Sequence, residues 1–273
     1  MNHFRPAAVA GYFYPRNPIE LSNQIDSFLK EANPDFKADK TIGLVSPHAG
    51  YVYSGKTAAY GFNQLLNKDI ENVIIISPSH REYFPGISVY DGDGYETPLG
   101  KVKINQKIAD SLINGSKLIF RGIQGHRMEH AVEVQIPFLQ KILKNFNIVP
   151  VVMGDQGKIF VDELSERLAD IADEKTIIIA SSDMSHFYDA ETANKLDSVV
   201  ENHINNFTYE ELHHDLETKK CEACGGGPIV VLMKTADLLS KQKARVLHRS
   251  DSGDVTGDKS EVVGYLSAVV YGD

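Results

Sequence analysis

The stretch TIGLVS at residues 41–46 is a short apolar run that leads directly into Pro47 and His48. Similar runs recur as NVIIIS (72–77), IVPVVM (148–153) and TIIIAS (176–181). Runs of this length without alternating polar positions are typical of strands that are buried on both faces of a sheet. Helix-like segments separate them. The sequence therefore predicts one α/β domain over residues 1–273, with a central, mainly parallel or mixed sheet and helices on both faces.

The segments between these strands have the features of helices and turns. Asn17 followed by Pro18 is a favourable helix start, and the apolar residues after it recur near helical spacing. Short antiparallel strands separated by Gly and Pro turns are expected over 87–104, a further short strand over 117–120, and a final strand pair over 245–251 and 262–271. Helices are expected over 19–29, 58–66, 106–113, 130–143, 158–172, 190–218 (two helices) and 228–240.

Composition narrows the class of protein. The 273 residues carry a formal net charge of −9, which argues against binding to nucleic acid or to an anionic membrane surface, because both need a basic footprint. Apolar runs stay well short of a membrane span, and the N-terminal residues lack the apolar core of a signal peptide. Only two cysteines are present, too few for a disulfide framework. We expect a cytoplasmic protein with reduced thiols.

Three of the apolar strands run into loops that contain a histidine. Residues 41–46 lead to His48, residues 72–77 lead to His80, and residues 176–181 lead to Asp183 and His186. The crevice beyond the carboxyl ends of parallel strands is where α/β proteins bind ligands. A single loop histidine is more often solvated or hydrogen-bonded than a ligand, but three in equivalent places favour a site for iron, copper, zinc or nickel.

The segment CEACGGGP at residues 221–228 contains both cysteines. A C-x-x-C pair can serve a zinc site or a redox dithiol, although a four-cysteine zinc site is excluded because the chain has no other cysteine. A lone buried thiol is the alternative for either residue. Glycines let the backbone approach a ligand closely, and a helix that begins near Pro228 would lower the pKa of a nearby thiol. Cys224 is thus the better ligand candidate.

Two further polar stretches allow more than one interpretation. In EHAVEVQ (129–135), His130 and Glu133 would share one face of a helix, either as part of the site or as an exposed polar stripe. DSGDVTGD (251–258) contains several acids, but its spacing differs from that of a calcium-binding loop. A tight turn built from Asx and Gly residues is the favoured interpretation of the second stretch.

Taken together, these motifs resemble one known family. SPHAGYVYSG, SPSH, EHAVEVQIPFL, SSDMSH, CGGGPI and SGDVTGD occur in this order and resemble the Memo-like proteins, whose microbial members are also called AmmeMemoRadiSam system protein B. The resemblance extends from GYFYP near residue 11 to VVGY at 262–265. It implies a fold similar to that of the class III extradiol ring-cleaving dioxygenases, which hold non-haem Fe(II) with two His and one Glu.

The resemblance also implies roles for individual residues. His48 and His80 match the two histidine ligands of the metal, and Cys224 stands where the dioxygenases have their Glu. Asp183 and His186 match the remaining acid of the site and the His that acts as acid and base. His130 matches a further histidine of the pocket. Fe(II) is the expected metal, with copper or zinc as alternatives, since thiolate is a softer ligand than carboxylate.

A competing motif overlaps the first metal-ligand loop. Gly50, Gly55, Lys56 and Thr57 fit the phosphate-binding pattern G-x-x-x-x-G-K-[ST]. In such a loop, however, the strand should lead straight into the first glycine, and here residues 46–49 intervene. Tyr51 and Tyr53 would also crowd the phosphate. We therefore expect this stretch to carry a metal ligand, with Lys56 and Thr57 beginning the next helix.

Two functions fit these expectations. The first is a metal-dependent redox or oxygen-using enzyme that acts on a small organic molecule. The alternative is a non-catalytic module that binds a peptide or a partner protein in the same cleft, as signalling roles of the family's animal members suggest. Neither nucleic acid nor a membrane is expected as a partner.

Overall fold

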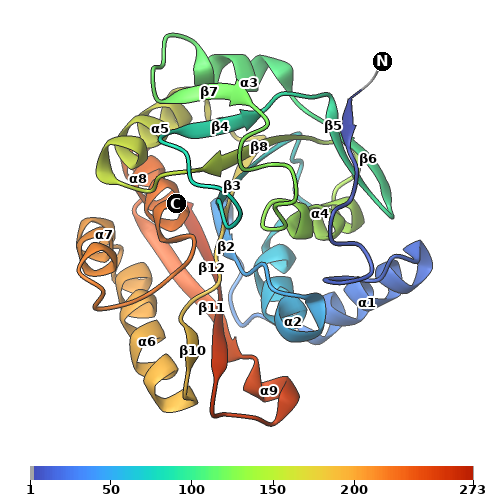
Figure 1. Ribbon diagram of the computed structural model, residues 1–273, viewed down its shortest axis with the longest axis vertical. Coiled ribbons are helices and arrows are strands. Elements are labelled where there is room, and N and C mark those ends of the chain that lie inside the picture. Colours follow the sequence, from blue (N-terminus) through green and yellow to red (C-terminus); the bar gives the residue numbers. More distant parts are fainter. Residues whose placement is uncertain (1–2, 273) are drawn as a thin grey trace.

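The computed structural model describes residues 3–272, and these residues form one large and one small sheet. The large sheet has nine strands, in the order β10-β12-β2-β9-β3-β8-β4-β7 with β11 on β12. Figure 1 shows this sheet extending from β10 up to β7. The strands are β2 (Lys40–Ser46), β3 (Asn72–Pro78), β4 (Ile87–Tyr90), β7 (Ile119–Gly122), β8 (Asn147–Met153), β9 (Thr176–Ser181), β10 (His186–Tyr188), β11 (Lys243–Asp251) and β12 (Val262–Gly272).

Parallel strands make up the centre of this sheet. β2, β9, β3 and β8 pair in parallel, whereas β12 pairs antiparallel with β2, β10 and β11, and β4 pairs antiparallel with β8. The four apolar runs thus form the predicted parallel core, and the last two strands form the predicted pair. In β3, residues 73–76 are fully buried, which is why the run lacks polar positions.

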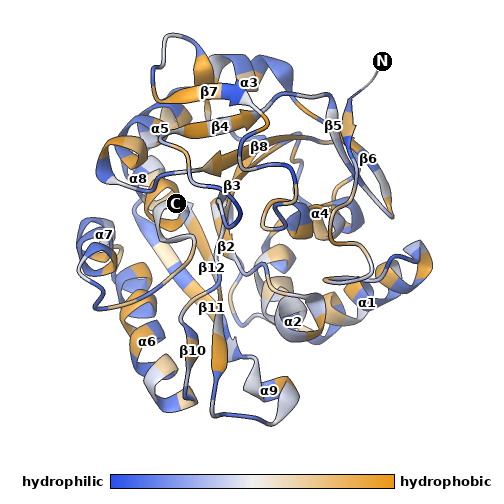
Figure 2. Ribbon diagram, viewed as in Figure 1, coloured by the Kyte–Doolittle hydropathy of each residue, from blue (hydrophilic) through white to orange (hydrophobic). Residues whose placement is uncertain are grey.

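Helices cover both faces of the sheet, so the predicted α/β class is confirmed (Figure 1). One face carries α1 (Pro18–Glu31), α2 (Tyr51–Phe62) and α4 (Ile136–Ile142). The other carries α3 (Gln106–Ile113), α5 (Lys158–Ile171), α6 (Ala190–Asn206), α7 (Tyr209–Glu217) and α8 (Gly226–Leu238). Figure 2 shows the apolar residues concentrated on the strands and on the helix sides that face them. Among the described residues, no helix combines the length and the apolar character that crossing a membrane requires.

The stretch 87–104 divides between the two sheets. β4 joins the large sheet, whereas β5 (Gly94–Thr97) and β6 (Gly100–Lys103) form an antiparallel hairpin in the small one. Its third strand, β1 (Phe4–Arg5), pairs in parallel with β5, so that Arg5 lies beside Tyr95. The antiparallel prediction holds for the hairpin and for the pairing of β4 with β8, but β4 also pairs in parallel with β7.

Two local expectations were wrong. α2 begins at Tyr51 rather than near Lys56. Residues 130–143 are not one helix, because α4 starts only at Ile136 after a 3-10 turn at Glu133–Gln135, with Pro137 in its first turn. The tight turn favoured for residues 251–258 is present as a one-turn helix, α9 (Gly253–Thr256), which ends at Gly257 with φ +78° and in which the carboxylate of Asp254 accepts the amide of Asp251. Lys259 lies between the carboxylates of Asp251 and Asp254, at 2.7 and 2.6 Å, and pairs with both of them.

Candidate metal centre

The loops after β2 and β3 bring the two predicted histidine ligands together. β9 lies between these strands in the sheet, and all three are parallel, so their carboxyl ends meet at one edge. The imidazole rings of His48 and His80 lie 5.0 Å apart, centroid to centroid. One nitrogen from each ring and the sulfur of Cys224 all lie within 4.8 Å of one another. The sequence-predicted ligand trio is therefore close enough to share one ion.

His48 is fixed in one tautomer by its neighbours. Its Nδ1 lies 2.9 Å from the hydroxyl of Ser181, which donates its own proton to the carbonyl of Ala131 and accepts a hydrogen bond from Gln135. That hydroxyl can only accept from His48, so Nδ1 carries the proton and Nε2 keeps its lone pair. Burial and the neighbouring His80 lower the pKa of His48 to about 3, which keeps the ring neutral. Its Nε2 lies 3.1 Å from the sulfur of Cys224.

His80 is oriented by Glu129, a buried residue that sequence reasoning did not single out. One carboxylate oxygen of Glu129 lies 2.9 Å from Nδ1 of His80, and the other accepts the amide of His80 at 2.7 Å. Burial opposes ionisation of Glu129, but the hydrogen bonds from His80 lower its pKa to about 2. The carboxylate is thus charged, and it leaves Nε2 of His80 free for a ligand bond. Its position directly before His130 was visible in the sequence, but nothing in the spacing connects it to residue 80.

Cys224 lies at the end of the loop that precedes α8. Its sulfur accepts the amide of Asp183 at 3.2 Å, and a side chain at Gly225 would collide with the carbonyl of Ser181. The expectation that the helix would lower the pKa of this thiol was wrong. Burial and the nearby Asp183 raise it well above its usual value. The first amides of α8 are also used elsewhere, since Gly227 donates to the side chain of Gln156 at 2.7 Å.

Asp183 lies on the loop after β9 and His186 is the first residue of β10, and the two side chains face different groups. Asp183 is buried, accepts the amide of His48 at 2.7 Å, and has its other oxygen 4.0 Å from Nε2 of His48. Burial raises the pKa of Asp183. His186 is half-buried, and its Nδ1 donates to the carbonyl of Met184 at 2.8 Å, which leaves Nε2 free to exchange a proton. The next residue, Phe187, has φ +63°.

His130 packs against both histidine ligands. Its ring stacks on that of His80 at 4.8 Å, lies edge-on to that of His48 at 5.3 Å, and is covered by Phe13 at 4.7 Å. Among the described residues, its buried Nδ1 makes no hydrogen bond, although it lies 3.3 Å from a carboxylate oxygen of Glu129. The expected shared helix face with Glu133 was wrong, because this segment is not helical at His130. Glu133 is buried and pairs with Arg5 at 2.6 Å.

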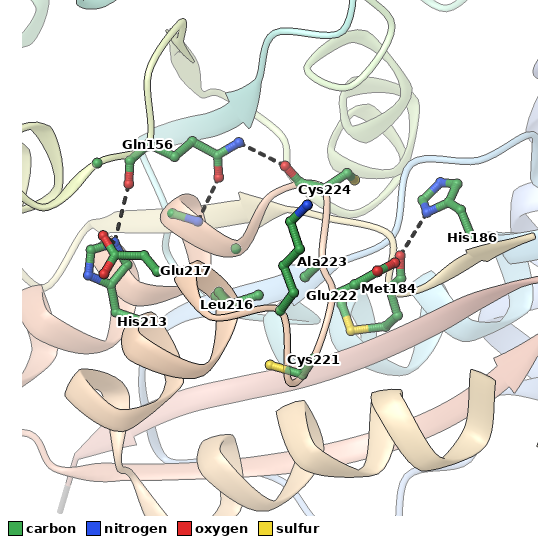
Figure 3. Close-up of a pocket in the computed structure, with 14 residues that line it drawn as sticks. Gln156, Met184, His186, His213, Leu216, Glu217, Cys221, Glu222, Ala223 and Cys224 are labelled. Atoms are coloured by element: carbon green, nitrogen blue, oxygen red, sulfur yellow. Dashed lines mark hydrogen bonds and ion pairs between the residues drawn. The ribbon is translucent and has the colours of Figure 1, made fainter. Parts of the chain in front are cut away.

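A cavity of about 510 Å³ adjoins the centre on the side of α7 and α8. Cys224 and His186 border it, together with apolar groups such as Met184 and Leu216. Figure 3 shows His186 on one side of the segment 221–224 and Gln156 on the other. The cavity is large enough for a small organic molecule.

Cys221 lies apart from this centre. Its side chain is buried, and Figure 3 shows it well away from Cys224, at the other end of the short segment that holds both. Both thiols are free. Burial raises the pKa of Cys221 to about 11. These are the properties of a buried core thiol rather than of one half of a redox dithiol.

The nucleotide-binding alternative does not fit the geometry of α2. Because the helix begins at Tyr51, the four variable positions of the motif are helical and cannot form a phosphate-binding loop. Gly55 lies inside α2 and packs against the ring of Phe28 from α1. Lys56 points to Glu31, at 3.7 Å, rather than toward the helix N-terminus.

Comparisons with known proteins agree with the motif pattern. A family model described as Memo-like protein matches residues 5–269. MEMO1 family proteins of Thermoplasma volcanium and Thermoplasma acidophilum are 40% and 41% identical to this chain, over 97% of it and 97% and 98% of theirs. One from Methanocaldococcus jannaschii is 37% identical over 99% of this chain and all of its own. An uncharacterized protein from Escherichia coli K12 of known crystal structure aligns with a TM-score of 0.47 and 13% identity, over 74% of this chain and 86% of its own.

Proposed function

This chain belongs to the Memo-like protein family, and on this premise we propose that His48, His80 and Cys224 hold one metal ion in an oxygen-using or redox enzyme. The substrate is a small organic molecule that enters through the cavity beside Cys224. The observation that carries the proposal is the convergence of two imidazole nitrogens and one thiol within 4.8 Å of one another.

The chemistry of these donors supports a metal ion. Hydrogen bonds to Ser181 and Glu129 hold the protons on Nδ1 of His48 and of His80, so that the lone pair of each ring is on Nε2 and available to a metal ion. The thiol of Cys224 has a raised pKa because no positive charge stabilises a thiolate in this buried place. A bound metal ion would supply that positive charge and displace the thiol proton. Two imidazoles and a thiolate suit iron, copper or zinc.

Fe(II) is the metal we propose, with copper or zinc as alternatives. When bound, iron or copper supplies electron transfer for oxygen chemistry, whereas zinc supplies only Lewis acidity. The thiolate favours the softer ions, and the two imidazoles suit each of the three.

The remaining groups of the site would handle protons and exclude water. His186 has a free Nε2 at the cavity wall, which is where a proton donor or acceptor for a bound substrate is needed. A carboxyl oxygen of Asp183 lies 4.0 Å from Nε2 of His48, so a metal ion bound there would favour the charged form of Asp183, which would in turn stabilise the ion. The rings of His130 and Phe13 cover the far side of the centre and keep water from it.

Metal analysis of protein purified without added metal tests this function. We expect about one equivalent of iron or copper per chain, lost in His48→Ala and in His80→Ala but retained in His214→Ala, an exposed histidine of α7. Stopped-flow mixing of the reduced, loaded protein with oxygen should then show oxidation of the centre. Stoichiometric metal in both ligand variants would refute the ligand set. Loaded protein that is inert to oxygen would favour the peptide-binding or protein-binding alternative.

A further inference from the structure

An N-terminal strap, residues 4–14, packs beside the metal centre on the side of His80, since Arg5 contacts the backbone of Glu129 and Phe13 lies against the ring of His130. Arg5 lies within it, and its guanidinium group is buried. Its Nε donates to the carbonyl of His126 at 2.6 Å, one terminal nitrogen donates to Glu133 at 2.6 Å, and the other donates to the carbonyl of Glu129. The guanidinium also lies over the ring of Tyr95 at 4.7 Å.

Glu133 anchors the strap at several points besides Arg5. Its carboxylate accepts the amides of Ala8 at 2.8 Å and Val9 at 3.0 Å, and the hydroxyl of Tyr14 at 2.5 Å. The charge of Glu133 is therefore fully paired and hydrogen-bonded although its side chain is buried. The position of the guanidinium is thus set by the strap and by Glu133, independently of the metal ligands.

The two carbonyl groups that Arg5 contacts belong to the loop that orients His80. This loop, residues 125–131, begins at Gly125 with φ +72° and exposes Met128 to solvent. Its next residue, Glu129, holds His80 through the hydrogen bond to Nδ1 at 2.9 Å. Arg5 therefore fixes the backbone of the same residue whose carboxylate directs the imidazole.

We propose that Arg5 is a positioning residue of the metal centre, which holds Glu129 and, through it, the imidazole of His80 in the direction that a metal ion needs. The inference rests on the proposed function, because it assigns a role toward the ion that His80 would bind. A planar guanidinium with several fixed donors can hold two carbonyls and a carboxylate at once. A lysine ammonium carries the same charge but lacks this fork, so it would keep the pair with Glu133 and release the loop.

The variant Arg5→Lys tests this role, because it keeps a positive charge beside Glu133 and is expected to fold. The probe is Co²⁺, whose thiolate charge-transfer and ligand-field absorption bands report the geometry of the bound ion. Loss of the direct hydrogen-bond partner of a metal ligand typically lowers affinity about tenfold to a hundredfold. Arg5 acts on His80 only through Glu129, so we expect a loss at the lower end of this range, about tenfold, with shifted bands. The matched control is Arg167→Lys, since Arg167 likewise contacts a carboxylate, that of Glu163, and a backbone carbonyl, that of Asn114, but on α5.

A double-mutant cycle separates positioning from general loosening of the fold. If Arg5 acts through Glu129, then Glu129→Gln and Arg5→Lys should not add, and the double variant should bind Co²⁺ about as weakly as Glu129→Gln alone. Additive losses, or an Arg5→Lys variant with the affinity and spectrum of wild type, would overturn the proposal.

Hydrogen exchange keeps the inference testable if the protein binds no metal. The amides of His130 and Ala131 donate to Glu129 at 2.9 and 3.0 Å, so they report whether its carboxylate is held in place. We expect them to exchange faster in metal-free Arg5→Lys and at the wild-type rate in Arg167→Lys. Failure of Co²⁺ to bind wild type would refute the proposed function, whereas unchanged exchange in Arg5→Lys would refute the role of Arg5.

Discussion

On the side of His80, the charged groups near the metal centre are buried and paired. On the side of His186, a cavity adjoins the centre, and other charged groups, Glu217, Lys219 and Glu222, border it. Arg5, Glu129 and Glu133 are each at most 4% exposed and are joined by hydrogen bonds to the strap and the loop 125–131. On the other side, Phe187 is 71% exposed, and both Phe187 and Lys219 have positive φ angles, 63° and 58°.

This difference assigns separate tasks to the two sides. A buried network with all its polar groups satisfied holds ligands in one geometry and resists local opening. A side with exposed groups, backbone strain and an adjoining cavity opens more readily and can admit a molecule. In the proposed enzyme, the side of His80 would hold the metal ion, and the side of His186 would receive the substrate.

The largest loss of metal affinity is expected from replacement of a cysteine. The two cysteine variants test whether Cys224, and not Cys221, is one of the groups that hold the metal ion. Cys224→Ser should lower metal affinity by more than the roughly tenfold to hundredfold typical of a lost hydrogen-bond partner, because a serine hydroxyl is a poor anionic ligand. Cys221→Ser should change it by no more than about twofold, since that thiol is a core residue. Affinities measured by chelator competition decide between them, and equal losses would favour a dithiol.

Replacement of His186 tests the open side. His186→Ala should keep the metal content and the fold, because its hydrogen bond goes to the carbonyl of Met184 and not to a ligand. Turnover of any substrate that is found should fall about 100-fold to 10,000-fold, the usual contribution of a proton-transfer group. Steady-state kinetics with His214→Ala as control would show this. Wild-type turnover in His186→Ala would remove its catalytic role.

Replacement of Glu133 tests the buried charge network on the side of His80. In Glu133→Gln, the buried guanidinium of Arg5 loses its opposite charge, which typically costs about 3–5 kcal/mol of unfolding free energy. The control is Glu163→Gln, because Glu163 pairs with Arg167 in a more exposed place, at 26% side-chain exposure, and should lose less than about 1 kcal/mol. Urea unfolding measures both. Similar losses would mean that the network contributes no more than a surface ion pair.

The smallest effect concerns the strained backbone beside His186. Phe187→Gly should be about 1 kcal/mol more stable than Phe187→Ala, because alanine keeps the unfavourable left-handed conformation and glycine does not. At Lys195, an exposed position inside α6, the order should reverse, with alanine about 1 kcal/mol better. Thermal unfolding of the four variants tests the sign. The same order at both positions would show that the angle at Phe187 stores no strain.

The sequence predicted the parts of the fold that depend on local pattern. The buried runs that became β2, β3, β8 and β9, the helix start at Asn17 and the final strand pair all follow from periodicity and capping. The meeting of His48 and His80 also followed, because the carboxyl ends of parallel strands share an edge. The ligand role of Cys224 came chiefly from the family resemblance, and its bound metal stays a prediction.

What the sequence did not reveal depends on contacts between distant residues. Glu129 and His80 are 49 residues apart, and Arg5 and Glu133 are 128 apart, so no local spacing signals either pair. The segment around His130 has helical periodicity, but the regular helix starts only at Ile136, and the amides of His130 and Ala131 donate to the carboxylate of Glu129 instead. The thiol pKa of Cys224 was predicted in the wrong direction, because burial outweighs the helix N-terminus.

The separation between Arg5 and Glu133 also sets an order of assembly during synthesis. The strap leaves the ribosome before Glu133 does, because the carboxylate that receives Arg5 is 128 residues further along the chain. Closing so long a loop has an entropic cost that the contacts of the completed sheet must offset. We therefore expect the strap to dock late, after the parallel strands have formed, so that the imidazole groups of a nascent chain are in place before Arg5 can hold the loop that orients His80.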